Sequence, residues 1–227
     1  MTKSSNRFSG MDYPSIKEEI ANSITHGFGV LLSFIGIPIM VSYAVFKGTP
    51  QHVWAVSIFS ATLLMLYIFS TVYHSIQQPS AKRVLRIFDH ISIYFLIAGS
   101  YTPFILFFMN RTSGYVFLGL IWAIALAGTI FKVFFTGKFN LISTILYVAM
   151  GWMVLFIAKP IFSAMSFEGI LWLAIGGGAY TLGVVFYLWK NLRYNHAIWH
   201  VFVLTGSISH YISVLYSMDY VVGNISL

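Results

Sequence analysis

Apolar residues along this chain gather into seven long runs, which cover residues 24–46, 53–73, 87–109, 115–135, 141–158, 169–189 and 197–218. Each run is close to the length of about 20 residues that an α-helix needs to cross the hydrocarbon core of a bilayer. The connecting segments, among them KGTPQ, MNRTSG and TGKFN, are short and contain turn residues. The pattern therefore predicts an all-α fold, a seven-transmembrane helical bundle with no soluble domain between the spans.

These runs divide the chain into three parts. Residues 1–23 are a predicted cytoplasmic N-terminal segment, residues 24–218 the seven-transmembrane domain, and residues 219–227 a short extracytoplasmic tail. In the first segment, SIKEEIANS places Glu18 three residues after Ser15, which is the pattern of a helix capping box and could mark an interfacial helix. The same segment is polar and charged, lacks the apolar centre of a secretory signal, and is expected to be retained.

Composition agrees with a membrane protein, since 58% of the residues are hydrophobic, only 8% are charged and the mean hydropathy is +0.81. The chain has no cysteine, which excludes thiolate metal ligands, disulfides and a cysteine nucleophile. Lysine and arginine outnumber acidic residues by 13 to 6. Basic loops between apolar helices commonly record membrane orientation, so we predict no nucleic-acid partner.

The distribution of basic residues predicts the orientation. Ten of them fall before the first span and in alternate loops: Lys3, Arg7, Lys17, Lys82, Arg83, Arg86, Lys132, Lys138, Lys190 and Arg193. The opposite side holds only Lys47, Arg111 and Lys159. Because positive charge is retained in the cytoplasm, the N-terminus is predicted to be cytoplasmic and the C-terminus extracytoplasmic.

Three histidines are expected to share one layer near the cytoplasmic boundary. His74 closes the second span, and the segment NHAIWH places His196 and His200 at the start of the seventh. Residues four apart project from one face of a helix on adjacent turns, so this pair can hold one metal ion. His74 supplies a third ligand, as catalytic zinc sites require. An all-imidazole set suits zinc, although other divalent ions would bind it too.

Further polar residues are expected near this layer. Asp89 opens the third span and could take a proton from a water held by the metal, or could cap its helix. Ser70 lies one turn deeper than His74 on the same face and could orient that imidazole or a water, or could bond back to its own helix. His90 is expected at the interface. His210 is predicted about 15 Å deeper than His200, facing either a cavity or a neighbouring helix.

Three ordered motifs resemble the hemolysin III proteins and, more broadly, the progestin and adipoQ receptor (PAQR) family, which includes the adiponectin receptors. EEIANSITHG resembles the first motif, STVYH followed by FDHISIYFLIAGSYTPF the second, and NHAIWH the third. The resemblance covers almost the whole chain. It implies a member in the inner (plasma) membrane of a bacterium.

The resemblance also implies a site. It assigns zinc to the histidines matching His74, His196 and His200, and a contact with the zinc-bound water to Asp89. Related receptors are linked to hydrolysis of ceramide-like lipid amides, so a membrane lipid is the implied substrate or ligand. In the first motif, Glu19, Asn22 and His26 belong to the family pattern without being zinc ligands. We interpret these three residues as structural support for the site.

The sequence leaves three functions open. The first is a zinc-dependent hydrolase of a membrane lipid amide or ester, which is the preferred hypothesis. The second is a receptor-like sensor in which zinc only clamps the second, third and seventh helices, and the third is a hemolysin-like pore. Three histidines with a water would favour the enzyme, whereas four protein ligands would favour the clamp. The sequence does not indicate the lipid substrate or an oligomeric state.

Overall fold

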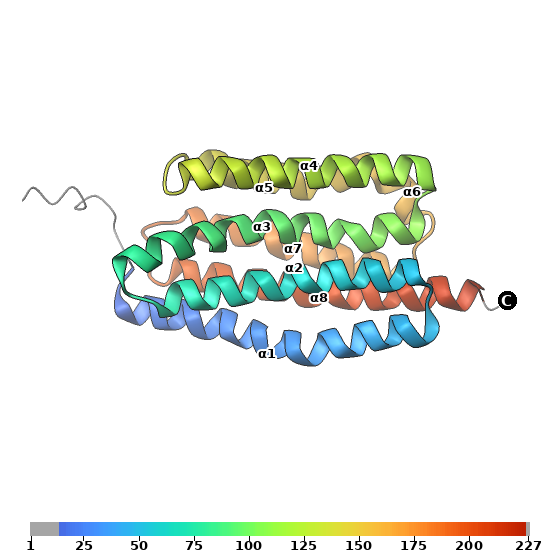
Figure 1. Ribbon diagram of the computed structural model, residues 1–227, viewed down its shortest axis with the longest axis horizontal. Coiled ribbons are helices and arrows are strands. Elements are labelled where there is room, and N and C mark those ends of the chain that lie inside the picture. Colours follow the sequence, from blue (N-terminus) through green and yellow to red (C-terminus); the bar gives the residue numbers. More distant parts are fainter. Residues whose placement is uncertain (1–13, 226–227) are drawn as a thin grey trace, which may run out of the picture.

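The computed structural model describes residues 14–225, and all regular structure in that range is helical (Figure 1). The elements are α1 (Ile16–Lys47), α2 (Pro50–Ser75), α3 (Pro79–Phe108), α4 (Arg111–Phe135), α5 (Asn140–Trp152), η1 (Met153–Ile157), α6 (Ala158–Phe162), α7 (Phe167–Leu188) and α8 (Asn195–Ile225).

Seven helical segments of the described chain are long and apolar enough to cross a membrane, which confirms the predicted number of spans. The fifth crossing, Asn140–Phe162, is formed by α5, the 3₁₀ turn η1 and α6 together. The start of α1 and the end of α8 lie at opposite ends of the bundle, as an odd number of crossings requires (Figure 1). The side of the membrane that each end faces stays a prediction.

The first span begins earlier than its apolar run. Ser15 and Glu18 form the predicted capping box, in which the Ser15 hydroxyl accepts from the Glu18 backbone N–H and Glu18 accepts from the Ser15 backbone N–H. The helix that starts there continues without a break to Lys47, so no separate interfacial helix forms. As a result, the motif residues Glu19, Asn22 and His26 lie on the first span itself.

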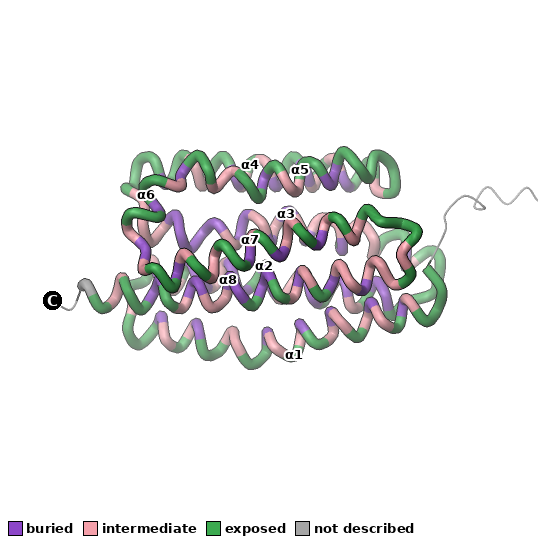
Figure 2. The backbone as a smooth tube through the Cα atoms, turned by 180° about the vertical axis from the view of Figure 1, so that it is seen from behind, coloured by how far each residue is buried: buried purple, intermediate pink, exposed green. Residues whose placement is uncertain are grey.

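The helices form a core of α2, α3 and α8 with the other helices around it (Figures 1 and 2). Contacts are extensive between α1 and α2, between α2 and α3, and between α7 and α8, while α4 and α5 form an outer layer beside α3. The outer faces carry large apolar side chains, such as Phe46 and Phe156, which are 82% and 81% exposed to the surroundings. These surfaces suit lipid tails rather than water.

Glycines allow three of the close helix contacts. A Cβ atom at Gly29 would lie 2.4 Å from the Tyr67 ring, one at Gly99 would lie 2.0 Å from the Thr62 hydroxyl, and one at Gly128 would lie 2.4 Å from the Tyr94 ring. Small residues let backbones approach closely in membranes, where packing rather than the hydrophobic effect holds helices together. These contacts fix the register of α1 on α2, of α2 on α3, and of α3 on α4.

The contact at Gly128 gives a test of this packing. Gly128→Ala should lower the stability of the purified protein by about 1–3 kcal/mol, because the new methyl group would overlap the buried Tyr94 ring. Gly119→Ala on the same helix is the matched control, since a Cβ there has no other atom within 4 Å among those described. Thermal unfolding in detergent measures both. Equal shifts in melting temperature would contradict the packing of α4 on α3.

Candidate metal centre

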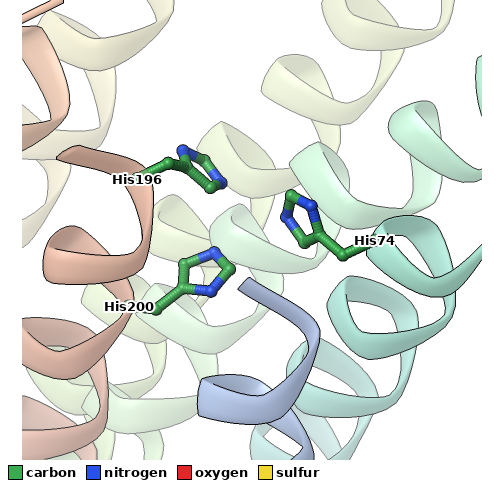
Figure 3. A group of neighbouring side chains, drawn as sticks. All are labelled: His74, His196 and His200. Atoms are coloured by element: carbon green, nitrogen blue, oxygen red, sulfur yellow. The ribbon is translucent and has the colours of Figure 1, made fainter. Parts of the chain in front are cut away.

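Three histidine side chains converge where the end of α2 meets the start of α8 (Figure 3). His74 is the second-last residue of α2, and His196 and His200 project from the first two turns of α8. One nitrogen of each ring lies within 4.8 Å of a nitrogen of the other two. The residues that the sequence predicted to share one layer therefore form a possible metal site.

The imidazole nitrogens that face one another are buried and unpaired. His74 and His200 are each only 2% exposed, and Nε2 of both His74 and His196 has no hydrogen-bond partner anywhere in the described chain. An unpaired polar atom in such a place is unfavourable by roughly 1–3 kcal/mol. A cation between the rings would accept these lone pairs, so the residues present fit a divalent metal ion.

Helix α1 holds two of the rings through their other nitrogen. His74 Nδ1 lies 2.5 Å from Glu19 Oε2, and His200 Nδ1 lies 3.0 Å from the Asn22 backbone oxygen and 3.1 Å from the Thr25 hydroxyl. A carbonyl oxygen can only accept, so the proton of His200 is on Nδ1. A proton on Nδ1 of His74 likewise gives the Glu19 carboxylate a hydrogen bond. In both rings Nε2 is then the free, lone-pair nitrogen that a metal requires.

A buried ion pair anchors Glu19. The second carboxylate oxygen, Oε1, lies 2.8 Å from Lys82 Nζ, and both side chains are nearly inaccessible, at 2% and 3% exposure. Lys82 also donates to the backbone oxygens of Tyr73 at 3.1 Å and Ile76 at 3.2 Å. This network joins α1, the end of α2 and the start of α3. The sequence had placed Lys82 among the loop charges, whereas the structure places it inside the bundle.

The other residues of the first motif also lie against the histidines. The His26 ring stacks on His200, with centroids 3.5 Å apart and planes at 12°, and meets the edge of Tyr67 at 5.2 Å. The Asn22 side-chain nitrogen is 3.4 Å from His74 Nδ1. These positions agree with a supporting role for Glu19, Asn22 and His26, which stays a prediction.

Asp89 and Ser70 lie beside the three histidines. The described residues contribute no carboxylate to the group of ligand atoms within 4.8 Å, so Asp89 is a neighbour of the trio rather than a member. Asp89 is ten residues inside α3, which begins at Pro79, so the alternative that it caps its helix is wrong. The buried Ser70 hydroxyl has no partner in the part of the chain that the structure describes, so bonding back to its own helix is also not observed.

His90 faces the site as well, contrary to the expectation that it lies at the interface. Its Nδ1 donates to the Arg86 backbone oxygen at 2.8 Å and lies 3.4 Å from Asp89 Oδ2. The Tyr147 hydroxyl donates to the His90 backbone oxygen at 2.9 Å, which ties α3 to α5. His90, Lys82 and Thr25 are thus contacts of the site that sequence reasoning missed, because no spacing rule indicates which neighbouring helix they meet.

A cavity of about 440 Å³ lies beside the three-histidine site, within the bundle. His26, Ser70, Asp89, His196 and His200 line one part of it, and His210 lines another. The remaining wall is mostly apolar and comes from α3, α5, η1, α6, α7 and α8, including Ile97, Phe104, Val148, Leu155, Ile161, Leu173 and Val203. The three-histidine site therefore borders a space suited to an apolar chain.

Comparison with known proteins identifies the group to which this arrangement belongs. A sequence model described as Haemolysin-III related matches residues 14–211. The chain belongs to this haemolysin-III family. It is 44% identical over 202 residues to a Hemolysin-3 homolog of Bacillus subtilis (strain 168), which covers 89% of the chain and 95% of the relative. It is 42% identical over 201 residues to Hemolysin-3 of Bacillus cereus, covering 88% and 92%.

The chain also resembles a human protein, at lower sequence identity. The Monocyte to macrophage differentiation factor of Homo sapiens is 29% identical over 210 residues, covering 88% of the chain and 84% of the relative. The bacterial relatives and the seven spans together identify a multi-pass bacterial membrane protein. The resemblance drawn from the three motifs is confirmed.

The contact between Glu19 and His74 predicts a change in metal affinity. Glu19→Gln should weaken Zn²⁺ binding by about 10- to 100-fold, because the acceptor that orients His74 loses its charge. The change also leaves Lys82 without its counter-ion, so Glu19→Gln with Lys82→Met should recover stability without recovering affinity.

Competition with a chelating dye measures the affinity, and thermal unfolding the stability. Glu18→Gln is the matched control: Glu18 is in the same turn but bonds to Ser15 and to the Tyr194 backbone N–H. Zinc affinity that is equal in Glu19→Gln and Glu18→Gln would show that Glu19 does not position His74.

Proposed function

We propose that this haemolysin-III family protein is a zinc-dependent hydrolase, in the bacterial inner membrane, of a lipid amide or ester. The observation that carries the proposal is the joint position of the metal centre and the cavity. Three imidazoles gather among the described residues with no fourth histidine or carboxylate, and two of them, His196 and His200, line a mostly apolar cavity that Asp89 and Ser70 also line. Three ligands with one open position are typical of catalytic zinc.

Each part of the site has a chemical task in this proposal. Zinc held by His74, His196 and His200 would polarise the carbonyl group of the substrate and make water more acidic. Asp89 accepts a proton from the attacking water and returns it to the leaving nitrogen or oxygen, so that the proton count balances. The unpaired Ser70 hydroxyl holds the water or the substrate carbonyl oxygen. The apolar wall binds the acyl chain.

A structural clamp is the second candidate, and one observation favours it. The histidines join α2 to α8, and the Glu19–Lys82 pair extends the same network to α1 and α3. A metal there would stabilise the bundle whether or not chemistry takes place. The two candidates differ in what the loss of Asp89 should do, because Asp89 is not among the converging ligands.

The metal assignment predicts about one zinc ion per chain after purification without chelator. His196→Ala with His200→Ala should remove it, because one remaining imidazole cannot hold the ion. Elemental analysis of purified protein measures the content. His52→Ala is the control: His52 lies at the opposite end of α2, where its Nδ1 accepts from the Thr49 N–H, so this change should lower stability somewhat and keep the metal. Unchanged metal content in the double variant would refute the site.

The role of Asp89 predicts a separation of binding from turnover. Asp89→Asn preserves side-chain shape, so zinc should stay bound by three imidazoles while hydrolysis of lipid amides falls by roughly 100-fold or more, as expected when a general base is lost. Zinc content and hydrolysis are measured in the same samples of parent and variant. A fully zinc-loaded parent that is inert on a broad panel of lipid amides and esters would favour the clamp.

A further inference from the structure

His210 is a polar side chain far from the metal centre that lines the same cavity. It follows His200 by ten residues on α8, which corresponds to a rise of about 15 Å along the helix. The side chain is 9% exposed. The sequence left open whether it would face a cavity or a neighbouring helix, and the structure places it in the cavity wall.

The ring of His210 is held by packing rather than by hydrogen bonds. A Cβ atom at Gly176 would lie 2.2 Å from His210 Cδ2, so α7 has room for the imidazole only because it carries glycine there. The Tyr180 ring meets the imidazole edge-on, with centroids 5.2 Å apart. Gly177 and Gly178, which follow Gly176, also line the cavity, and a Cβ at either would meet no other described atom within 4 Å.

Both ring nitrogens of His210 lack a hydrogen-bond partner within residues 14–225. The Leu173 carbonyl approaches the ring, but no contact with it has the geometry of a hydrogen bond. Nearby hydroxyl groups of the cavity wall are in contrast satisfied: Ser100 donates to Ile97 O, Tyr101 to Gly151 O, Thr181 to Gly177 O, and Tyr180 bonds to Ser207. His210 therefore retains a donor and an acceptor for a ligand.

We propose that His210 recognises an oxygen carried part-way along a long-chain lipid whose reactive end lies at the three histidines. This inference rests on the proposed function, because it takes the cavity as the binding site of the lipid. A neutral imidazole has one N–H and one lone pair on different ring nitrogens, so a hydroxyl can pair with either nitrogen, whereas a keto oxygen can pair only with the N–H. The preferred substrate class is an amide or ester of a hydroxylated fatty acid.

The spacing of His200 and His210 and the apolar cavity wall favour a lipid chain with a single oxygen part-way along it over a lipid with a second polar headgroup. The separation of about 15 Å between His200 and His210 is bridged by a flexible alkyl chain. The wall between them is largely apolar, with Ile97, Leu173 and Val203 among its residues. A ligand with many polar groups would leave them unpaired there, at a cost in free energy.

Binding of four octadecanoic acids to the purified zinc-loaded protein tests the proposal. One acid is unsubstituted, and the others carry a single hydroxyl next to the carboxylate, at mid-chain or at the far end. Displacement of a fluorescent fatty acid measures each affinity. The parent should prefer the mid-chain acid over the unsubstituted acid by about tenfold, the size expected for one buried hydrogen bond. His210→Phe should lose this preference and still bind the unsubstituted acid.

Two further variants complete the test. His210→Gln retains a donor and an acceptor and should recover part of the preference. Tyr211→Phe is the matched control on the same helix. The Tyr211 hydroxyl donates to the Gly36 carbonyl, so its loss should leave the preference for the mid-chain acid unchanged. If all four acids bind without positional preference, a water is the partner of His210 and this inference fails while the proposed function stands. If no acid binds the parent, both fail.

Discussion

The position of the Glu19 carboxylate between His74 and Lys82 is the constraint on which the rest of the site depends. In the hydrocarbon region an unpaired charge is strongly unfavourable, and removing one partner of a buried ion pair typically destabilises a protein by about 3–5 kcal/mol. Both oxygens of Glu19 are occupied, one by the imidazole and one by the ammonium group, and Lys82 also binds the backbone oxygens at the end of α2. Rotation or sliding of α1 against α2 would break several of these contacts together, so the pair fixes the register of these helices.

This register explains how α1 shapes a site to which it contributes no converging ligand. Glu19 and the Asn22 backbone oxygen accept from the Nδ1 atoms of His74 and His200, so the Nε2 atoms of both rings remain free as lone pairs. His26, one turn beyond Asn22, stacks on His200 and limits rotation of that ring. The supporting helix therefore determines the protonation and orientation of the imidazoles, while α2 and α8 supply them.

The sequence predicted those parts of the structure that depend on periodicity and depth. Seven apolar runs give the spans, and the spacing of His196 and His200 together with the end of the second run gives the three-histidine layer. Lys82 was assigned to a loop, and a capping role was left open for Asp89, because apolar runs begin later than helices: α3 starts at Pro79, which places Lys82 on its first turn and Asp89 in its third. The cavity depends on which helix faces meet, and no pattern along a single helix contains that information.

The hydrogen bonding of the polar side chains that line the cavity bears on whether the cavity is a binding site or a packing defect. Membrane proteins satisfy their buried polar groups internally, because lipid offers no hydrogen bonds. His26, Ser70, His196 and His210 keep buried nitrogen or oxygen atoms without partners in the described chain and line one cavity, although unpaired groups such as the Tyr67 and Tyr94 hydroxyls also occur away from it. Other side chains of the cavity wall, such as Tyr101 and Thr181, bond to backbone oxygens. A metal that only clamped helices would need the histidine cluster but neither the cavity nor an unpaired His210. The joint occurrence of the histidine cluster, the cavity and the unpaired His210 is what the proposed lipid site would require.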